Sequence, residues 1–437
     1  MDERPTRIGT PPVDAAEAVA RLRAAAIPPE ILEVAATLQD AGHAAVLVGG
    51  AVRDALLQLA ADDWDLATSA TPEEVQRIFP RTLPTGVEHG TVTVLVRPRH
   101  GKGKASPVEV TTFRGEGAYV DGRHPSEVVF LRELDDDLAR RDFTVNAFAW
   151  DPRAEAFRDP FGGLADLQAA RLRAVGDPTQ RFHEDGLRTI RAVRFCATRG
   201  LALDEATAAA IPEALEVLDR VSRERVWTEF GKLLAAPRPS LGLLPMIATG
   251  MWSHVVAPVP PELLREAVAH VDLLPRDAVL RLARLLRPLA QRSDDDRRAA
   301  FASFVALKPS KQDRQRLEAL LGPAACAVPD AASMPEMRAH VAALGRVHLD
   351  DVLAIFGCDA EHSERLRTAV DGIPLTAREL PVTGRDLQQA GIVQPGPAMG
   401  RVLDGLLQRI WSDPSLRERE RLLEVARTLA DDVSPSL

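Results

Sequence analysis

Cysteine is scarce in this 437-residue sequence, and its scarcity excludes several kinds of site. The three cysteines, Cys196, Cys326 and Cys358, lie far apart and form no Cys-x-x-Cys pair, so neither a zinc site nor a disulfide framework is expected. Sparse cysteine is typical of a reducing compartment. No apolar run is long enough to cross a bilayer, and the polar N-terminus has no signal-peptide core. We therefore expect a cytoplasmic protein with no membrane association.

Aromatic residues and lysines are also few. One Tyr, 5 Trp and 13 Phe are too few for a stacking platform that holds single-stranded nucleic acid unaided. Only five lysines occur, so most of the 54 basic residues are arginines, whose planar guanidinium suits carboxylates, phosphates and base edges. The net charge of -9 argues against a basic nucleic-acid-binding domain. Basic residues nevertheless exceed acidic ones within 181–199 and 276–316, which predicts a positive stripe on one face.

The chain changes character near residue 160. Before that point, short β-branched runs alternate with helical patterns; the expected strands are Ala44–Val48, Asp62–Leu66, Thr91–Val96 and Val108–Phe113, the last two antiparallel. After it, Leu/Ala/Arg helical periodicity dominates. The predicted fold class is α+β, with a small mixed-sheet head followed by an extended all-helical neck, body and tail. The predicted boundaries are a poorly structured segment at 1–27 (with a helix from Val13 to Ala26), the head at 28–155, the neck at 156–236, and the body and tail at 237–437.

Two short motifs in the head suggest chemistry on an anionic substrate. Gly49 and Gly50 follow a buried strand and precede a helix, where glycines let backbone N–H groups approach an anion. Thirteen residues later, Asp63 and Asp65 stand two apart, so on a strand they point to the same side and repel each other. A divalent cation such as Mg²⁺ removes that repulsion. Each motif alone also fits an ordinary turn or a solvated strand face.

A third acid strengthens the interpretation. Glu109 lies between Val108 and Val110 in another predicted strand, where a glutamate is more often on the exposed face. Beside the aspartate pair it could complete a metal cage. A glycine turn, an aspartate pair and a lone strand acid together suit two-metal phosphoryl transfer.

At this point the sequence resembles a known family. Five ordered motifs are similar to those of class II tRNA nucleotidyltransferases (CCA-adding enzymes) and bacterial poly(A) polymerases, within the polymerase-β nucleotidyltransferase superfamily. The matching segments are 46–68, 140–147, 159–163, 184–195 and 222–232. The resemblance implies a nucleotidyltransferase head, a base-recognising neck and a tRNA-binding body and tail. It also implies Mg²⁺ as cofactor, with tRNA, CTP and ATP as partners; no protein partner is predicted.

The family's functional residues carry over position by position. The resemblance implies Asp63, Asp65 and Glu109 as catalytic residues, with the two aspartates as metal ligands. The implied nucleotide-binding residues are Gly49, Gly50, Arg53, Arg141, Asp142, Asn146, Asp185, Arg188 and Arg191. Asp142 and Asn146 are expected at the ribose hydroxyls. Asp185 and Arg188, three apart on one expected helix, would select cytosine and adenine through an amine and its neighbouring acceptor, although a plain surface ion pair is the alternative.

Several alternatives stay open. The chain could add only the final A beside a separate CC-adding enzyme, could be a poly(A) polymerase, or could be a non-catalytic RNA-binding protein. The loop 112–125, which holds Tyr119, is of full length, and this leans against a CC-only enzyme. No His-Asp dipeptide occurs, so we expect no second, phosphohydrolase activity. The acidic clusters Asp135–Asp137 and Asp294–Asp296 are expected as solvated turns or helix starts.

Overall fold

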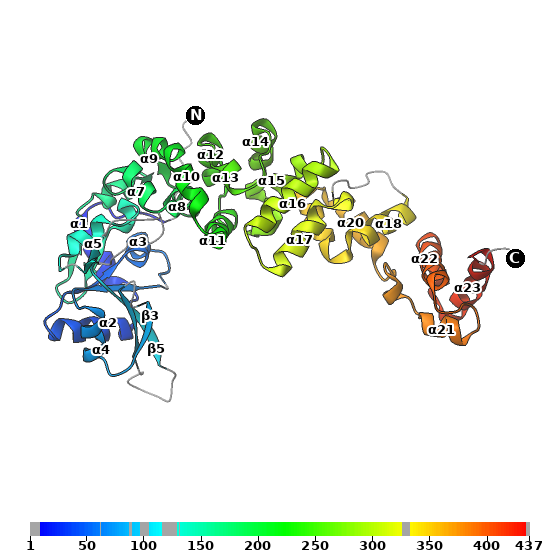
Figure 1. Ribbon diagram of the computed structural model, residues 1–437, viewed down its shortest axis with the longest axis horizontal. Coiled ribbons are helices and arrows are strands. Elements are labelled where there is room, and N and C mark those ends of the chain that lie inside the picture. Colours follow the sequence, from blue (N-terminus) through cyan, green and yellow to red (C-terminus); the bar gives the residue numbers. More distant parts are fainter. Residues whose placement is uncertain are drawn as a thin grey trace. The chain divides into compact units, whose positions relative to one another are not determined.

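The computed structural model describes residues 9–61, 63–86, 90–96, 105–115, 129–130, 132–325 and 333–433 (Figure 1). It forms two compact units, residues 1–261 and 262–437. Within the described ranges, no helix has the length and apolar character needed to cross a membrane. The first unit contains the predicted head and neck.

A seven-stranded mixed sheet forms the core of the head, in the order β3-β4-β5-β2-β1-β8-β9. The strands are β1 (Ala45–Val48), β2 (Asp65–Thr68), β3 (Thr82–Gly86), β4 (Thr91–Val96), β5 (Ser106–Thr112), β8 (Ala149–Asp151) and β9 (Ala156–Arg158). Only β2 and β5 pair in parallel; every other neighbouring pair in this sheet is antiparallel. The predicted mixed sheet and the antiparallel pairing of β4 with β5 are therefore confirmed.

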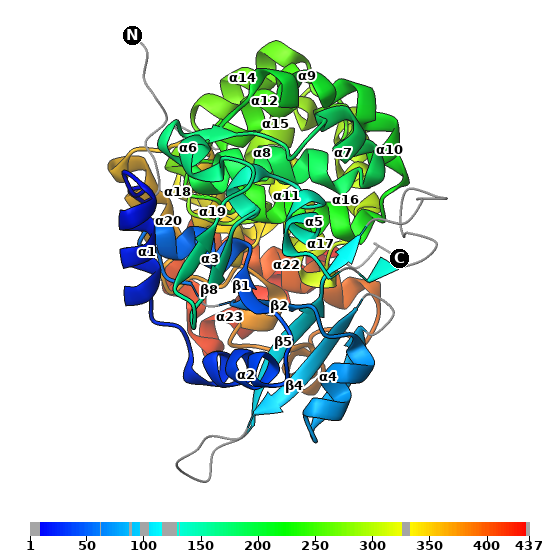
Figure 2. The ribbon, with the colours of Figure 1, turned by 90° about the vertical axis from the view of Figure 1, so that its left-hand side faces the viewer.

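Helices pack against the sheet. The helices α2 (Pro29–Asp40) and α4 (Pro72–Ile78) pack against the strands (Figure 2). Elsewhere Val46, Val48 and Ala67 form a buried cluster with Leu138 of α5 (Leu134–Ala139). Because strand residues alternate in direction, Asp65 shares this face with Val48, its partner across the β1–β2 pair. The acid thus lies where the apolar cluster of that face gives way to polar residues.

The N-terminal segment is more ordered than expected. Helix α1 (Ala15–Ala24) confirms the helix predicted there, and the Asp14 side chain caps it by accepting from the Glu17 amide at 2.8 Å. Leu22 is fully buried, and Arg21 donates to the carbonyl of Leu56 at 2.6 Å. The expectation of a poorly structured segment is therefore wrong for residues 9–27, because apolar burial anchors the helix. Residues 1–8 lie outside the described residues.

The neck is helical but not entirely so. Strand β9 falls within the predicted neck yet belongs to the head sheet, and β10 (Arg171–Leu172) pairs in parallel with β11 (Ala202–Leu203). The remaining elements of the first unit are α3 (Gly50–Leu56), β6 (Arg114–Gly115), β7 (Val129–Phe130), α6 (Gly163–Gln168), α7 (Pro178–Glu184), α8 (Leu187–Arg199), α9 (Glu205–Ala210), α10 (Leu215–Arg220), α11 (Arg223–Leu234), α12 (Ser240–Ala248) and α13 (Trp252–Val255). The all-helical prediction thus fails only at these short strands.

The second unit is helical throughout its described residues. Its helices are α14 (Pro261–Ala269), α15 (Ala278–Ala290), α16 (Asp294–Ala306), α17 (Lys311–Leu321), α18 (Met334–Leu344), α19 (Leu349–Phe356), α20 (Ala360–Val370), α21 (Gly384–Gln389), α22 (Pro397–Ser412) and α23 (Arg419–Val433). Near the C-terminus, Leu387, Val402, Leu406 and Leu422 form a separate buried cluster. The predicted helical body and tail are confirmed.

Much of the positive charge in the second unit is engaged within the fold. Arg281, only 1% exposed, donates to the Leu274 carbonyl at 2.8 Å. Arg316 pairs with Asp277 at 2.6 Å and with Asp351 at 2.8 Å. The local excess of basic residues between 276 and 316 therefore overstates the charge available to a nucleic acid.

Candidate functional site

Three predicted catalytic carboxylates lie close together on two neighbouring strands, two at the start of β2 and one within β5. Asp63 precedes β2 and Asp65 begins it; both are exposed, while Trp64 between them is buried. In the parallel β2–β5 pair, Leu66 faces Val110, which puts Asp65 level with Glu109. Although the Asp65 side chain reaches solvent, the protein around it removes part of its hydration and raises its pKa, as do the charges of Asp63 and Glu109, while Arg141 lowers it.

The strand predicted from Asp62 begins three residues later than expected. Asp63 therefore lies in the segment that leads into the sheet, although its side chain stays on the same exposed side as that of Asp65. Asp62 lies outside the described residues. The alternation exposed–buried–exposed over 63–65 preserves the predicted pair.

The donor set fits a magnesium ion held partly by substrate. Nowhere in the described part of the chain do three His, Cys, Asp or Glu residues form a group that could hold a metal. The structure thus does not support a three-carboxylate cage that includes Glu109. Two adjacent aspartates remain, and Mg²⁺ is commonly bound by one or two carboxylates together with substrate phosphates.

The glycine turn lies beside these acids. Gly49 has a φ of +77°, which favours glycine, and it precedes α3, which begins at Gly50. A Cβ on Gly49 would lie 2.9 Å from Nη1 of Arg141 and 3.7 Å from Oδ2 of Asp65. The turn, the Arg141 guanidinium and the Asp65 carboxylate therefore meet at one point.

A pocket of about 350 Å³ opens between the sheet and the neck helices. Six of the predicted site residues line it, namely Asp65, Arg141, Asp142, Asp185, Arg188 and Arg191. The walls also include Asp137, Arg140 and Arg225, which the sequence did not single out as site residues. The other six predicted residues lie outside its lining: Gly49, Gly50, Arg53, Asp63, Glu109 and Asn146.

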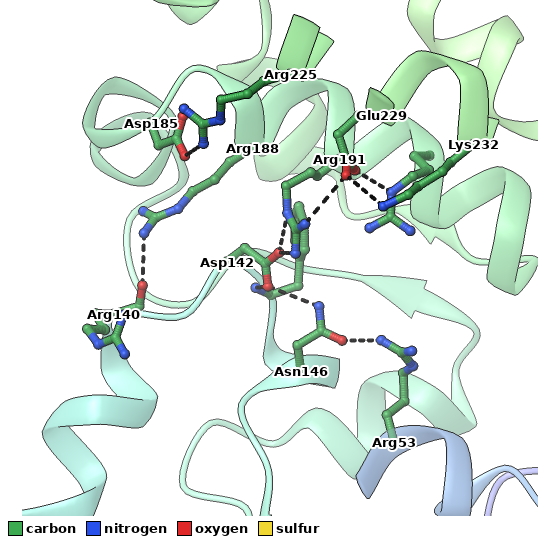
Figure 3. A network of polar contacts seen from close by, with 12 residues as sticks. Arg53, Arg140, Asp142, Asn146, Asp185, Arg188, Arg191, Arg225, Glu229 and Lys232 are labelled. Carbon is green, nitrogen blue, oxygen red and sulfur yellow. Dashed lines mark hydrogen bonds and ion pairs between the residues drawn. The ribbon is translucent and has the colours of Figure 1, made fainter. Parts of the chain in front are cut away.

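Asp142 stands at the centre of a polar network (Figure 3). Its Oδ2 accepts from Nε and Nη2 of Arg191 at 2.9 and 2.6 Å, and its Oδ1 accepts from Asn146 and from the Phe143 amide. Burial alone would raise the pKa of Asp142, but Arg191 and the bond from Asn146 bring it to about 2. A carboxylate has about four acceptor sites, and all four are used here.

Arg53 supports this network through its contact with Asn146. It is 3% exposed, donates to Asp54 at 2.8 Å and also donates to Oδ1 of Asn146. Burial lowers its pKa to about 10. Asp54 in turn accepts from Arg199 at 2.8 Å, so α3 is tied to the far end of α8. Arg53 therefore supports the glycine turn and does not face the pocket.

An aromatic ring supports the same arginines. The guanidinium carbons of Arg53, Arg191 and Arg194 lie 5.3, 5.6 and 3.9 Å from the ring centre of Phe195. Such contacts stabilise cations electrostatically. Glu229 of α11 pairs with Arg194 at 2.5 Å, which carries the network into the next helix.

The predicted base-selecting pair does not lie on one helix. Helix α7 ends at Glu184 and α8 begins at Leu187, so Asp185 and Arg188 flank a break. Oδ1 of Asp185 accepts from the Leu187 amide at 3.0 Å, and Oδ2 accepts from Arg225 at 3.1 Å. Gly186, beside the break, packs closely against α10, because a Cβ on it would lie 2.5 Å from the backbone nitrogen of Leu218. Both residues nevertheless face the same pocket.

Arg188 is fixed by three acceptors, two on α7 and one at the end of α5. Its Nη1 donates to Glu184 at 2.6 Å and to the Arg181 carbonyl at 3.0 Å. Its Nη2 donates to the Arg140 carbonyl at 2.9 Å (Figure 3). Glu184 also pairs with Arg181 at 2.9 Å. The guanidinium of Arg188 is therefore held in one orientation by the protein alone.

The two acidic clusters begin helices as expected, but one acid is not solvated. Asp135–Asp137 lie in the first turn of α5 and Asp294–Asp296 in that of α16. Asp137 is buried and bonded to Arg140 and Arg141. The i,i+3 and i,i+4 spacing to these arginines was the signal in the sequence that could have identified it. The loop with Tyr119 lies largely outside the described residues, which omit 116–128.

Comparisons with known proteins agree with this geometry. Residues 45–173 match the family model of the poly A polymerase head domain, and residues 200–265 match that of a probable RNA- and SrmB-binding site of polymerase A. A CCA-adding enzyme of Lacticaseibacillus paracasei is 37% identical over 90% of this chain and 95% of its own length. One of Lactiplantibacillus plantarum is 34% identical, with the same coverage.

Solved structures give the same result. The CCA-adding enzyme of Bacillus stearothermophilus, solved in complex with CTP, is 31% identical with a TM-score of 0.73, over 92% of this chain and 98% of that one. The Thermotoga maritima CCA-adding enzyme, complexed with tRNA, is 20% identical with a TM-score of 0.66, over 95% of this chain and 98% of that one, and supports the fold alone.

Proposed function

Because the chain belongs to the family of CCA-adding enzymes, we propose that it adds the terminal CCA to tRNA from CTP and ATP through the pocket between head and neck. It is a nucleotidyltransferase, and the alternative of a non-catalytic RNA-binding protein is not favoured. The single observation that carries the proposal is the convergence of Asp65, Arg141, Asp185 and Arg188 on one pocket.

The reaction proposed is attack of the tRNA 3′-hydroxyl on the α-phosphorus of the nucleotide, with release of pyrophosphate. Asp63 and Asp65 would hold the divalent metal that the family uses, and we propose Mg²⁺ because both donors are carboxylates. When bound, such a cation supplies a lowered hydroxyl pKa and charge compensation for the phosphates. Glu109 is proposed to act beside Asp65 through its charge.

The remaining residues bind and orient the nucleotide. The Gly49–Gly50 turn and Arg141 face the place where phosphates would lie, since backbone N–H groups and a guanidinium both bind anions. Asp142 uses its four acceptor sites within the protein, so we propose that it acts by fixing Arg191 and Asn146 and not by direct contact with ribose.

Base choice is proposed to come from Asp185 and Arg188. A carboxylate accepts from an exocyclic amine, and a guanidinium donates to a ring acceptor, a combination that cytosine and adenine share and that uracil and guanine reverse. Each side chain is held by protein partners, Asp185 by Arg225 and Arg188 by Glu184. These two side chains would thus select the base in place of a nucleic-acid template. We also propose the cytoplasm as its compartment, on the sparse cysteines.

The test is to supply CTP and ATP together, one of them labelled, with tRNA ending before CCA, after C or after CC, and with an unrelated RNA. We expect completion of CCA on every tRNA and no extension of the unrelated RNA. Addition of A to the CC-ended tRNA alone would identify an A-adding enzyme, and a long A tail would identify a poly(A) polymerase. Either of those results would overturn the proposal.

A further inference from the structure

Of the three acids that begin α5, only Asp137 turns inward. Asp137 is 1% exposed, whereas Asp135 is 51% exposed and pairs with Arg158 at the surface; Asp136 is exposed as well. A buried carboxylate is costly unless it is paired and hydrogen-bonded. Its position in the pocket wall therefore requires partners strong enough to hold a charge there.

Those partners come from three sides. Oδ1 accepts from Nη2 and Nε of Arg140 at 2.6 and 3.0 Å, and the amide of Arg114, just beyond β5, lies 3.4 Å away. Oδ2 accepts from Nη2 of Arg141 at 3.2 Å. Burial would raise the pKa of Asp137, but the two arginines lower it below its ordinary value, so the group is a carboxylate at neutral pH.

The bond to Arg141 decides where that guanidinium points. While Nη2 is held by Asp137, Nη1 lies 2.9 Å from the place that a Cβ on Gly49 would take. Oδ2 of Asp65 lies 3.7 Å from that same place. Arg141 therefore stands between two carboxylates, one that bonds it on the pocket wall and one that belongs to the catalytic pair.

We infer that Asp137 is a positioning residue for the nucleotide: it holds Arg141 on the pocket wall, directed at the glycine turn, and keeps it from closing onto Asp65. The charge of Arg141 already acts on the Asp65 carboxylate, so without the Asp137 charge Arg141 can pair with Asp65, and a guanidinium paired there is lost to the phosphates. This inference rests on the proposed function, since it assumes that the phosphates lie beside the glycine turn.

The test compares Asp137→Asn with Asp136→Asn, a matched change one residue away on the exposed side of the same helix. A charge-assisted hydrogen bond contributes about 1.5 to 3 kcal/mol, so we expect Asp137→Asn to raise KM for CTP and for ATP by the same factor, roughly ten-fold or more. We expect kcat, KM for tRNA and the preference for C and A over U and G to change less than about two-fold, because the side chains of Asp185 and Arg188 keep their partners Arg225 and Glu184. Asp136→Asn should behave as the unchanged protein, and Asp137→Glu should recover part of the loss.

Three results would overturn the inference: an unchanged nucleotide KM, a loss of base preference in parallel with KM, or an equal effect of Asp136→Asn. If Asp137→Asn does not fold, judged by circular dichroism, the comparison moves to Asp137→Glu with and without Arg141→Gln. The inference then requires that Asp137→Glu raise KM in the unchanged background and have no further effect once Arg141 is removed. Calorimetric titration with CTP checks binding without turnover. Failure of the unchanged protein to extend any tRNA would instead contradict the proposed function.

Discussion

Arginine performs different work in the two units of this protein. Around the head pocket, arginines pair with carboxylates, as Arg191 does with Asp142 and Arg188 with Glu184. In the second unit, the buried Arg338 donates to the carbonyls of Ala369 and Trp411, and the exposed Arg346 donates to that of Val370 at 2.6 Å, although Arg316 there pairs with carboxylates. The first arrangement places charges along the pocket wall, whereas the second satisfies the last carbonyls of helices.

The difference teaches that the same residue type supports function in one unit and stability in the other. Counting basic residues along the sequence could not separate the two uses. Substitutions can, because a change at the pocket should alter catalysis, whereas a change at a helix end should alter unfolding.

The largest expected effect is catalytic. Asp63→Ala should lower the rate of nucleotide addition by roughly a thousand-fold or more, since it removes a proposed metal ligand. Because Asp63 is exposed and repels Asp65, the variant should unfold at the same temperature as the unchanged protein or slightly above it. Single-turnover incorporation measures the rate of addition, and thermal unfolding measures the unfolding temperature. Turnover retained within ten-fold would remove Asp63 from the site.

A change at the centre of the pocket network should affect both properties. Arg191→Met leaves Asp142 buried beside an apolar side chain and should cost about 3 to 5 kcal/mol of unfolding free energy at pH 7. In the unchanged protein the pKa of Asp142 is lowered to about 2 from its ordinary value of 3.8, so its stabilisation, about 2 kcal/mol, is present above pH 4 and is lost as the pH falls toward 2.

The sign of this pH dependence provides the check. Arg191→Met should raise the pKa of Asp142, so the stability gap between the two proteins should shrink as the pH falls from 4 to 2. Denaturant unfolding at a series of pH values measures the gap. A gap independent of pH would show that Arg191 does not act through Asp142.

In the second unit we expect a substitution that lowers stability without changing catalysis. Arg338→Met removes the donor to two carbonyls, those of Ala369 and Trp411, and should cost about 2 to 3 kcal/mol in unfolding. Nucleotide addition per folded molecule should stay unchanged at saturating tRNA. A fall in kcat without a loss of stability would erase the contrast between the two units.

The smallest effects should come from exposed cations. Arg298 pairs with Asp295 at the surface, while Arg314 is an exposed residue of α17. We expect both Arg298→Gln and Arg314→Gln to change stability by less than about 0.5 kcal/mol. If α17 contacts tRNA phosphates, Arg314→Gln alone should lower the salt dependence of tRNA binding by about one phosphate contact. Equal slopes for both variants would place the RNA surface elsewhere.

Local patterns predicted most of the fold. The apolar run at 45–48 and the β-branched runs of β4 and β5 each specify their strand by themselves. The start of β2 and the break at Asp185 were mispredicted; Asp185 is extended and bonds Arg225, 40 residues away, a contact that no local pattern records.

The sequence predicted which residues form the site better than it predicted what each of them contacts. Its carboxylates and arginines follow from motifs, but their partners are far away in sequence: Asp142 meets Arg191, and Arg53 meets Asn146. The first pair depends on how the neck folds onto the head and the second on how the head itself folds, and no local pattern records either. The burial of Asp137 was missed although its spacing to Arg140 and Arg141 offered a local signal.

The most direct test of the account measures base choice by the pocket. For the unchanged protein, Arg188→Gln and the control Arg220→Gln, which changes an exposed residue of α10 outside the pocket wall, kcat/KM is measured for CTP and UTP on tRNA lacking CCA and for ATP and GTP on tRNA ending in CC. We predict that Arg188→Gln reduces the preference for C over U and for A over G by roughly 10- to 100-fold while tRNA affinity stays within two-fold, and that Arg220→Gln keeps the preference. An equal fall for all four nucleotides in Arg188→Gln would contradict the claim that this pocket selects the base.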